Sequence, residues 1–324
     1  MSEALAVLGA GAWGTALAIQ AARAGGTVTL WARDPVRAAA MEQTREAPRL
    51  PGPRLPAGLR VTADLPQRAA LVLLAVPMQQ LRAVAARLSP GDAPLVVCAK
   101  GVEAGTGALP LEVLAEVQPN RPAMVLTGPN FAHEIAAGLP AAAVVAGPYA
   151  ALRDRVAARL GTPAFRLYGN DDPVGAQIGG AAKNVIAIAA GAVIGAGLGE
   201  NARAALITRG LAELARLVTA LGGRSETVMG LSGLGDLLLT CTGPASRNFS
   251  LGVALGRGET LAEILAGRSA VTEGVTTAPA LLLRARQAGG VELPICEAVA
   301  ALLSGRTTLA EAMAALLARP RRDE

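Results

Sequence analysis

Short apolar runs alternate with stretches of helical character over the first part of the chain. Most of these runs end at a glycine or a proline, and the alanine-rich segment at residues 15–23 has the pattern of a helix. Continuous apolar runs are typical of strands buried on both faces of a parallel sheet. The pattern predicts strands at residues 5–8, 27–32, 71–76, 95–99, 124–127, 141–146 and 165–168. Their alternation with helices predicts a doubly wound α/β domain of the Rossmann type.

The pattern changes after about residue 170. Apolar residues then recur three and four positions apart, as in Ile207, Leu211, Leu214, Val218 and Leu221, which places them on one face of a helix. Strand signals are scarce from there to the end. We therefore predict an N-terminal doubly wound Rossmann-type domain over residues 1–170 and an all-α C-terminal domain over residues 171–324, with the boundary in the loop at 169–173.

Composition and charge exclude several classes of protein. The 324 residues, 52% of them hydrophobic, are enough for two buried cores. The formal net charge of +5 slightly favours anionic ligands, but the arginines are scattered, so we expect no nucleic-acid partner. The uncharged stretch at residues 184–199, rich in Ala and Gly, is shorter than the roughly 20 residues that a membrane helix needs. It predicts a buried helix and no membrane partner.

The cysteines point to a reducing compartment. Cys98, Cys241 and Cys296 lie far apart, form no CxxC pair and leave an odd count. The sequence contains no zinc motif, so we expect no metal. We find no sign of an export signal, because Glu3 replaces the expected positive charge and glycines interrupt the apolar run. A cytoplasmic protein is therefore expected.

A glycine motif at the N-terminus predicts a cofactor site in the first domain. Gly9, Gly11 and Gly14 form a GxGxxG motif between the first predicted strand and the first predicted helix. In this context the first glycine permits a tight turn and the second lets the backbone approach a pyrophosphate. The third lets helix and strand pack closely. The helix N-terminus adds free N–H groups for the phosphates. Residues 1–170 are therefore expected to bind a dinucleotide.

The end of the second predicted strand leaves the choice between NAD and NADP open. An NAD-specific site usually has an acidic residue there, which binds the ribose hydroxyls. This chain has Arg33 followed by Asp34. Arg33 could bind a 2′-phosphate and Asp34 a ribose hydroxyl, so the two signals point in opposite directions.

Only two of the 30 basic residues are lysines, Lys100 and Lys183. Arginine does not give up its proton in a protein, whereas lysine can when its surroundings lower its pKa. Reduction of a ketone needs a proton donor for the developing alkoxide, which makes both lysines candidates. Lys100 follows a predicted strand, at the carboxyl edge of the sheet where ligands bind. Lys183 stands among small residues at the head of the long apolar helix.

Other proton donors are less favoured. His133 is the single histidine, and a lone histidine near a helix start is more often structural or exposed than catalytic. The Tyr-x-x-x-Lys pair of short-chain dehydrogenases is absent, since neither Tyr149 nor Tyr168 is followed by lysine four residues on. That leaves the two lysines, Lys100 and Lys183, as the best candidates for the proton donor.

Several segments together resemble bacterial NAD(P)-dependent glycerol-3-phosphate dehydrogenase, and the resemblance covers nearly the whole chain. It rests on VLGAGAWGTALA, LLAVPMQQL, CAKGVE, TGPNFAHEIA, GGAAKNVIAIAAG, ENARAALITRGLAE, GLSGLGDLLLTCTGPASRN and TEGV. The lysine segment and the GLGDLLLTCT…SRN segment are the most specific of these. The glycine motif alone would not separate this family from many others.

The resemblance implies a role for each matching residue. Lys183 would be the general acid/base. The cofactor would contact Gly9, Gly11, Ala12, Trp13, Gly14, Arg33, Lys100, Ala132, Arg247, Val271 and Glu273. The substrate would contact Lys100, Gly128, Asn130, Lys183, Asp236, Ser246, Arg247 and Asn248. Position 130 usually holds serine or threonine in this family, and asparagine here can both donate and accept hydrogen bonds.

The residue types agree with two of these roles. Ser246, Arg247 and Asn248 offer a charged fork, an amide and a hydroxyl for a phosphate, although a solvated turn would use the same residues. Asp236 could orient Lys183 or a substrate hydroxyl, and a helix N-cap is the plain alternative.

The expected reaction transfers a hydride from NAD(P)H to C2 of dihydroxyacetone phosphate, which gives sn-glycerol 3-phosphate for phospholipid synthesis. The substrate is thus a small molecule, and a homodimer is one option for the oligomeric state. A ketopantoate reductase or a β-hydroxyacid dehydrogenase is the nearest rival, against which the SRN and GLGD segments argue. A dinucleotide-sensing protein without activity is a rival of another class.

Overall fold

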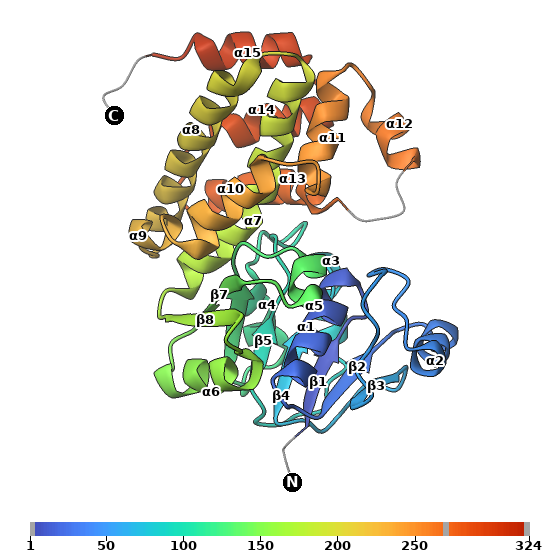
Figure 1. Ribbon diagram of the computed structural model, residues 1–324. Coiled ribbons are helices and arrows are strands. Elements are labelled where there is room, and N and C mark those ends of the chain that lie inside the picture. Colours follow the sequence, from blue (N-terminus) through green and yellow to red (C-terminus); the bar gives the residue numbers. More distant parts are fainter. Residues whose placement is uncertain (1–3, 268–271, 321–324) are drawn as a thin grey trace. The chain divides into compact units, whose positions relative to one another are not determined.

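The computed structural model describes residues 4–267 and 272–320, which divide into two compact units. Unit 1 contains the chain up to Lys100 together with Leu109–Gln177. Unit 2 contains Gly101–Ala108 and the chain from Ile178 onward. Eight residues from the first half of the sequence therefore belong to the second unit. Figure 1 shows the sheet in the first unit and the helices of the second.

Unit 1 is built on one eight-stranded sheet with the order β3-β2-β1-β4-β5-β6-β7-β8. The strands β1 and β4 at its centre are fully buried, as their continuous apolar sequences predict. Neighbouring strands are parallel except β6 and β7, which pair antiparallel. The strands are β1 (Leu5–Leu8), β2 (Val28–Trp31), β3 (Leu59–Thr62), β4 (Leu71–Leu74), β5 (Leu95–Val97), β6 (Ala123–Thr127), β7 (Ala141–Ala146) and β8 (Phe165–Asn170).

Seven of the eight strands lie where the apolar pattern predicts them, with ends that shift by one or two residues. The sequence pattern missed β3, an edge strand in which Leu59 and Val61 are buried while Arg60 is exposed. The parallel sheet that the apolar runs predict is confirmed except between β6 and β7, which pair antiparallel. The chain between these strands forms only the short helix α5 (Ala132–Ala137), so β7 runs back beside β6 without a full crossover.

The helices of unit 1 connect its strands, and they are α1 (Ala12–Arg23), α2 (Pro35–Thr44), α3 (Met78–Ala85), α4 (Pro110–Val117), α5 and α6 (Ala150–Leu160). Helix α1 contacts α5 and α6, and α3 contacts α4. Arg23 at the end of α1 donates to the carbonyl oxygens of Ile135 and Ala136 at 2.9 Å and 2.6 Å, which satisfies the C-terminal end of α5. The α/β fold expected for the first domain is confirmed.

The described residues of unit 2 form helices joined by loops, with no strand among them, so the helical character predicted for the second half of the chain is confirmed. Its elements are α7 (Pro173–Gly195), α8 (Gly199–Ala220), α9 (Ser225–Val228), the π-helical turn η1 (Leu231–Gly235), α10 (Asp236–Cys241), α11 (Arg247–Gly256), α12 (Leu261–Ala266), α13 (Glu273–Gln287), α14 (Pro294–Leu303) and α15 (Leu309–Leu317). Helix α7 belongs to unit 2 from Ile178 onward. It is long and apolar enough to cross a membrane, but 83% of its most apolar window is buried inside the protein. It is a core helix.

Helices α7 and α11 meet backbone to backbone. A Cβ atom on Gly191 of α7 would lie 2.1 Å from the Phe249 carbonyl oxygen, and one on Gly252 of α11 would lie 2.0 Å from that of Ile188. Both distances are far shorter than any van der Waals contact, so only glycine fits at either position. This contact fixes Lys183 and Asn184 on α7 relative to the first turn of α11.

Candidate functional site

The glycine loop after β1 has the geometry that its sequence predicts. Gly9 has φ +117°, and a Cβ there would lie 2.7 Å from the Ala75 carbonyl oxygen, so the turn requires glycine. A Cβ on Gly14 would lie 1.9 Å from the Gly9 carbonyl oxygen, which shows how closely α1 passes the loop. These two glycines therefore shape the loop through contacts within the protein.

Gly11 differs from them, because nothing in the protein requires it to be glycine. Its φ is −80°, and a Cβ there would meet no atom within 4 Å. It stands at the N-cap of α1 without a side-chain cap, and it faces open space. This is the arrangement that a pyrophosphate needs at a helix N-terminus. Ala12 and Trp13 in the first turn are half-buried, and the Trp13 indole N–H is buried without a partner among the described residues.

Arg33 and Asp34, at the end of β2, play different parts. The Asp34 carboxylate caps α2 by accepting from the backbone N–H groups of Val36 at 3.0 Å and Arg37 at 3.4 Å. Arg33 is exposed, and its guanidinium donates to the Gln80 side chain at 3.4 Å. The Asp34 carboxylate is thus used within the protein, whereas the Arg33 guanidinium lies at the surface, just after the end of β2.

Unit 1 brings together three of the residues expected to contact the substrate. The half-buried Lys100 ammonium donates to the Gly128 carbonyl oxygen at 3.0 Å. Gly128 has φ +141°, and its Cβ would lie 3.0 Å from Ala143 Cα. The Asn130 amide donates to the Ala142 carbonyl oxygen at 3.1 Å, while its Oδ1 atom is buried without a partner among the described residues. Asn130 can therefore still accept a hydrogen bond from a ligand.

The remaining candidates of this loop lie at or near the surface. Ala132 is half-buried at the first position of α5. The His133 side chain is 63% exposed and stacks on Phe131, with ring centroids 5.7 Å apart. This exposure agrees with the interpretation of His133 as an exposed residue without a catalytic role.

Unit 2 contains a buried ion pair between Lys183 and Asp236. The Lys183 ammonium donates to the Asp236 carboxylate, and the two residues are 8% and 0% exposed. Lys183 lies in the interior of α7 instead of at its head, because the helix begins ten residues earlier, at Pro173. Asp236 is the first residue of α10, and Gly235 occupies the N-cap. Its carboxylate therefore holds the lysine, and Asp236 is not the N-cap residue.

Close packing brings the two charged residues together. A Cβ on Gly179 would lie 2.6 Å from the Ser232 carbonyl oxygen, so α7 touches the backbone of η1. A Cβ on Gly233 would lie 2.0 Å from the Val228 carbonyl oxygen. Gly179 thus explains one of the small residues before the lysine in the sequence, and the two glycines together let η1 place Asp236 against α7.

The first turn of α11 is tied to α7 by a chain of side-chain hydrogen bonds. The Asn248 amide donates to Asn184 Oδ1 at 2.9 Å, and its Oδ1 accepts from the Gly274 N–H at 3.0 Å. Asn184 in turn donates to Glu273 at 3.3 Å. Asn184 carries no motif of its own, and the one signal for it in the sequence is its position directly after Lys183.

The other residues of the expected phosphate site stand at the start of α11. Ser246 is the N-cap residue, and its buried hydroxyl accepts from the Phe249 N–H at 3.2 Å. Arg247 is exposed at the first helical position. Val271 lies outside the described residues.

The thiols near the two lysines do not offer competing chemistry. Burial raises the pKa of Cys241 to about 12, against the lowering effect of the Lys183 charge. Burial likewise raises the pKa of Cys98 well above its usual range. Both remain protonated and weakly nucleophilic at neutral pH. Among the residues that the structure describes, no cluster of His, Cys, Asp or Glu could hold a metal ion.

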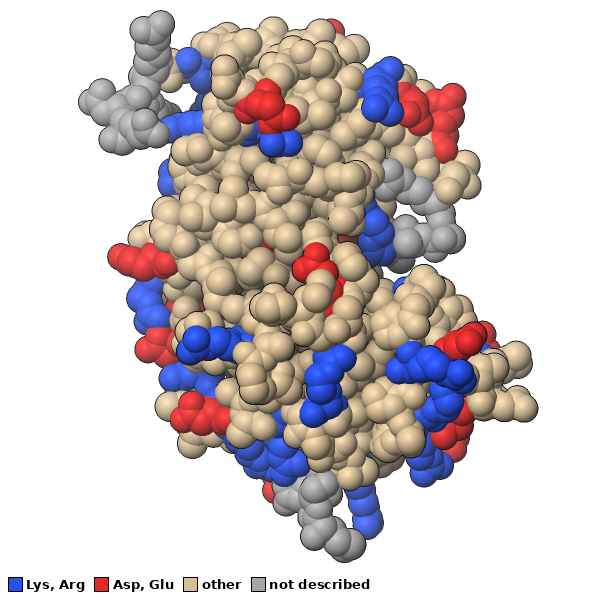
Figure 2. Space-filling view, in the orientation of Figure 1, with Lys and Arg blue, Asp and Glu red and all other residues tan. Residues whose placement is uncertain are grey.

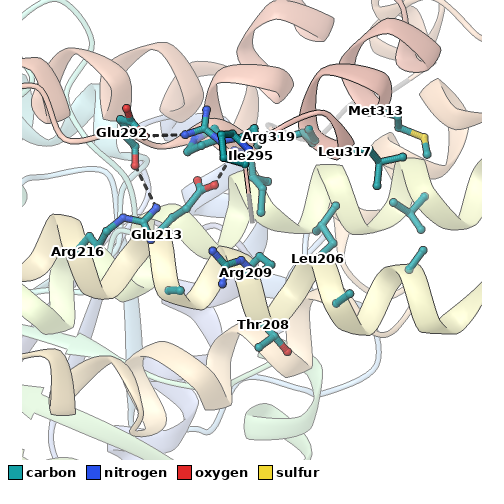
Figure 3. A pocket seen from close by; sticks show the side chains of 17 residues that line it. Leu206, Thr208, Arg209, Glu213, Arg216, Glu292, Ile295, Met313, Leu317 and Arg319 are labelled. Atoms are coloured by element: carbon teal, nitrogen blue, oxygen red, sulfur yellow. Dashed lines mark hydrogen bonds and ion pairs between the residues drawn. The ribbon is translucent and has the colours of Figure 1, made fainter. Parts of the chain in front are cut away.

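A cavity of about 680 Å³ in unit 2 is separate from these residues. It lies along α8 and is lined largely by apolar side chains, with Arg209, Glu213 and Arg216 among its polar ones (Figure 3). No residue expected to bind cofactor or substrate lines it. On the face shown in Figure 2, basic and acidic groups are interspersed.

The glycine loop of unit 1 and the buried lysine of unit 2 together define the class, a dinucleotide-dependent dehydrogenase. Two family models narrow it further. The model for the NAD-dependent glycerol-3-phosphate dehydrogenase N-terminus matches residues 4–152, and that for its C-terminus matches residues 172–314. The chain therefore belongs to the NAD-dependent glycerol-3-phosphate dehydrogenase family, and the resemblance inferred from sequence is confirmed.

Individual relatives agree with this assignment over their full lengths. A glycerol-3-phosphate dehydrogenase (NAD(P)+) from Acidiphilium cryptum is 61% identical over 98% of both chains. One from Gluconobacter oxydans is 54% identical over 98% of this chain and 97% of its own. The crystal structure of glycerol-3-phosphate dehydrogenase from Coxiella burnetii superposes with a TM-score of 0.94 at 36% identity, covering 98% of this chain and 99% of its own.

Proposed function

We propose that this protein reduces dihydroxyacetone phosphate to sn-glycerol 3-phosphate with NADH or NADPH, and that Lys183 supplies the proton. The relatives named above are NAD(P)-dependent enzymes that act on glycerol 3-phosphate, which supports the substrate and both cofactors. The observation that carries the mechanism is the buried Lys183–Asp236 pair. A cation shielded from water can stabilise the negative charge that develops on a carbonyl oxygen.

In this mechanism Lys183 and Asp236 divide the work. When bound, NAD(P)H would supply the hydride for C2 of the substrate, and the electron pair of the carbonyl bond would go to oxygen. The Lys183 ammonium gives that oxygen its proton and becomes a neutral amine, which takes up a proton from solvent before the next turnover. Asp236 orients the ammonium and offsets the cost of burying its charge. In the reverse direction a neutral Lys183 would accept the hydroxyl proton, so higher pH would favour oxidation.

The glycine loop would hold the cofactor. Gly11 faces open space at the N-terminus of α1, where the pyrophosphate would accept hydrogen bonds from backbone N–H groups. Gly9, Gly14, Ala12 and Trp13 would complete this part of the site. Arg33 would contact the 2′-phosphate of NADP, since it is exposed at the end of β2 while Asp34 is engaged as a helix cap. Ala132 and Glu273 are assigned to the cofactor by family resemblance alone.

We assign the substrate contacts first within unit 1 and then within unit 2. Lys100 and Asn130 would contact its oxygen atoms, Lys100 as a cation and Asn130 through the buried Oδ1 atom that has no partner among the described residues. Arg247 would pair with the phosphate, helped by the Ser246 hydroxyl. Both polar atoms of Asn248 are used within unit 2, so we assign it mainly to holding α11 in place. Gly128 would let the substrate approach the backbone beside Lys100.

A small-molecule substrate fits a cytoplasmic enzyme of phospholipid synthesis, and the three buried free cysteines suit a reducing compartment. We expect it to act without a nucleic-acid or membrane partner. Homodimer formation is compatible with this activity, and light scattering on the purified protein measures it directly.

A turnover assay tests the proposed function. Oxidation of NADH and of NADPH is followed by absorbance with dihydroxyacetone phosphate, and in parallel with ketopantoate, a carboxylate substrate of similar enzymes. We expect turnover with the phosphate and with both cofactors. Turnover with ketopantoate alone would refute the proposal in favour of the carboxylate reductases. Tight NADH binding with no turnover on either substrate would favour a dinucleotide sensor.

A further inference from the structure

The segment Gly101–Ala108, which we call the strap, connects Lys100 to the helical unit. It follows Lys100 directly in the sequence, yet its contacts group it with unit 2, while Lys100 and Leu109 on either side belong to unit 1. Gly101, with φ +133°, is the first strap residue after Lys100. The backbone position of Lys100 is therefore one peptide bond away from a segment that belongs with the other unit.

The strap is a compact loop held by its own hydrogen bonds. The Glu103 N–H donates to the Ala108 carbonyl oxygen at 2.9 Å, and the Gly107 N–H donates to the Glu103 carbonyl oxygen at 3.0 Å. The Thr106 hydroxyl donates to the Glu103 carboxylate at 2.7 Å and accepts from the Ala108 N–H at 3.1 Å. Val102 is fully buried. These contacts close the loop on itself, so a displacement at one end is transmitted to the other.

Gln287, the last residue of α13, holds the strap from outside. Its side-chain amide donates to the Thr106 carbonyl oxygen at 2.9 Å. Gly107 makes room for it, because a Cβ at that position would lie 2.7 Å from Gln287 Oε1. At its other end α13 begins at Glu273, which accepts from Asn184, the neighbour of Lys183. One helix therefore links the strap to the residues around Lys183.

We infer that Gln287 is a positioning residue for Lys100, which it acts on through the strap. The inference rests on the proposed role of Lys100 in holding the substrate. The Lys100 ammonium is held at one side by the Gly128 carbonyl oxygen, 3.0 Å away, and its backbone is held at the other by the strap. When the strap is loosened, the backbone of Lys100 can move. The ammonium then occupies its position beside the Gly128 carbonyl oxygen for a smaller fraction of the time, and the substrate binds less tightly.

Two variants loosen the strap in different ways. Gln287→Glu keeps the size of the side chain but loses the N–H donor to Thr106. Gly107→Ala introduces a Cβ against Gln287 Oε1, the far end of a flexible side chain, which can swing away and give up the bond while the fold is kept. Gly105→Ala is the matched control: its φ of +83° imposes similar backbone strain, but its Cβ would meet nothing within 4 Å.

We expect Gln287→Glu and Gly107→Ala each to raise KM for dihydroxyacetone phosphate about two- to tenfold, the value of one hydrogen bond. Gly105→Ala should keep the wild-type KM, and the dissociation constant for NADH should change less than KM in all three. Hydrogen exchange of the strap amides, measured without substrate, should speed up in the first two variants beyond the Gly105→Ala level.

A double-mutant cycle with Lys100→Met identifies the residue through which Gln287 acts. In the Lys100→Met background, Gln287→Glu should have no further effect on kcat/KM, because the group that it positions is gone. An undiminished effect in that background, or a normal KM for Gln287→Glu in an active enzyme, would overturn the inference and leave the proposed function intact. Absence of wild-type turnover on dihydroxyacetone phosphate would instead refute the proposed function itself.

Discussion

Replacing Glu213 by glutamine is expected to remove a large part of the pH dependence of stability in the helical unit. Glu213 lies on α8 with 3% of its surface exposed, and its carboxylate accepts from the backbone N–H groups of Ile295 at 2.7 Å and Cys296 at 3.4 Å. Figure 3 shows it directed toward Ile295. These amides belong to the first turn of α14, whose N-cap residue Leu293 offers no side-chain hydrogen bond. Glu213 therefore caps α14 from a different helix.

The size of the effect follows from the pKa of this carboxyl group. Burial raises the pKa of Glu213 from 4.5 to about 7, against the lowering effects of the two backbone hydrogen bonds and of Arg216. The pKa of Glu213 is higher in the folded protein than in the unfolded chain. The contribution of its bound proton to the free energy of unfolding is therefore fully present below about pH 4.5 and is lost as the pH rises through about 7. The shift corresponds to a loss of about 3 kcal/mol in the free energy of unfolding across that window.

Urea unfolding followed by circular dichroism between pH 4.5 and pH 8 measures this effect. Glutamine keeps an acceptor for Ile295 but cannot titrate, so the stability of Glu213→Gln relative to wild type should rise by about 3 kcal/mol over that range. Glu297→Gln, which changes an exposed carboxyl group on α14, is the control and should follow the wild-type profile. Equal pH dependence in wild type and Glu213→Gln would refute this account of the Glu213 carboxyl group.

Three further predictions concern the proposed site. Lys183→Met should bind NADH normally, as measured by nucleotide fluorescence. Its turnover should fall at least about a hundredfold, the lower end of what general acid catalysis supplies. Near-normal turnover would make Lys100, and then His133, the candidate proton donor. Arg33→Ala should raise KM for NADPH more than KM for NADH, and equal changes would show that Arg33 does not contact the 2′-phosphate. Arg247→Lys keeps the charge but loses the guanidinium fork, so KM for dihydroxyacetone phosphate should rise severalfold, whereas an unchanged KM would place the phosphate elsewhere.

The strands could be predicted from sequence because those at the sheet centre are buried on both faces. Strands such as β1 and β4 must be apolar at every position, and that pattern can be recognised without knowledge of the fold. The edge strand β3 exposes Arg60 and so lacks the signal. The antiparallel direction of β7 depends on how the chain between β6 and β7 folds back, which periodicity does not report.

The site was predicted less completely than the fold. The two lysines stood out because arginine replaces lysine everywhere else in the chain. The partner of Lys183 is 53 residues away in sequence, so Asp236 could be named only by family resemblance. The links from Asn184 to Asn248 and Glu273 span 64 and 89 residues. Contacts of this kind are created by the packing of α7, α11 and α13, and no local pattern records them.

The contact between α7 and α11 limits how this part of the protein can change in evolution. Most helix pairs tolerate new side chains because a larger residue on one helix can be matched by a smaller one on the other. Gly191 and Gly252 have no side chain that could become smaller, and each faces the backbone of the other helix. Any larger residue at either position would push the helices apart and carry Asn184 away from Asn248. Directed evolution of this enzyme should therefore find both glycines invariant even in libraries selected only for folding, with new variation entering along the outer face of α8.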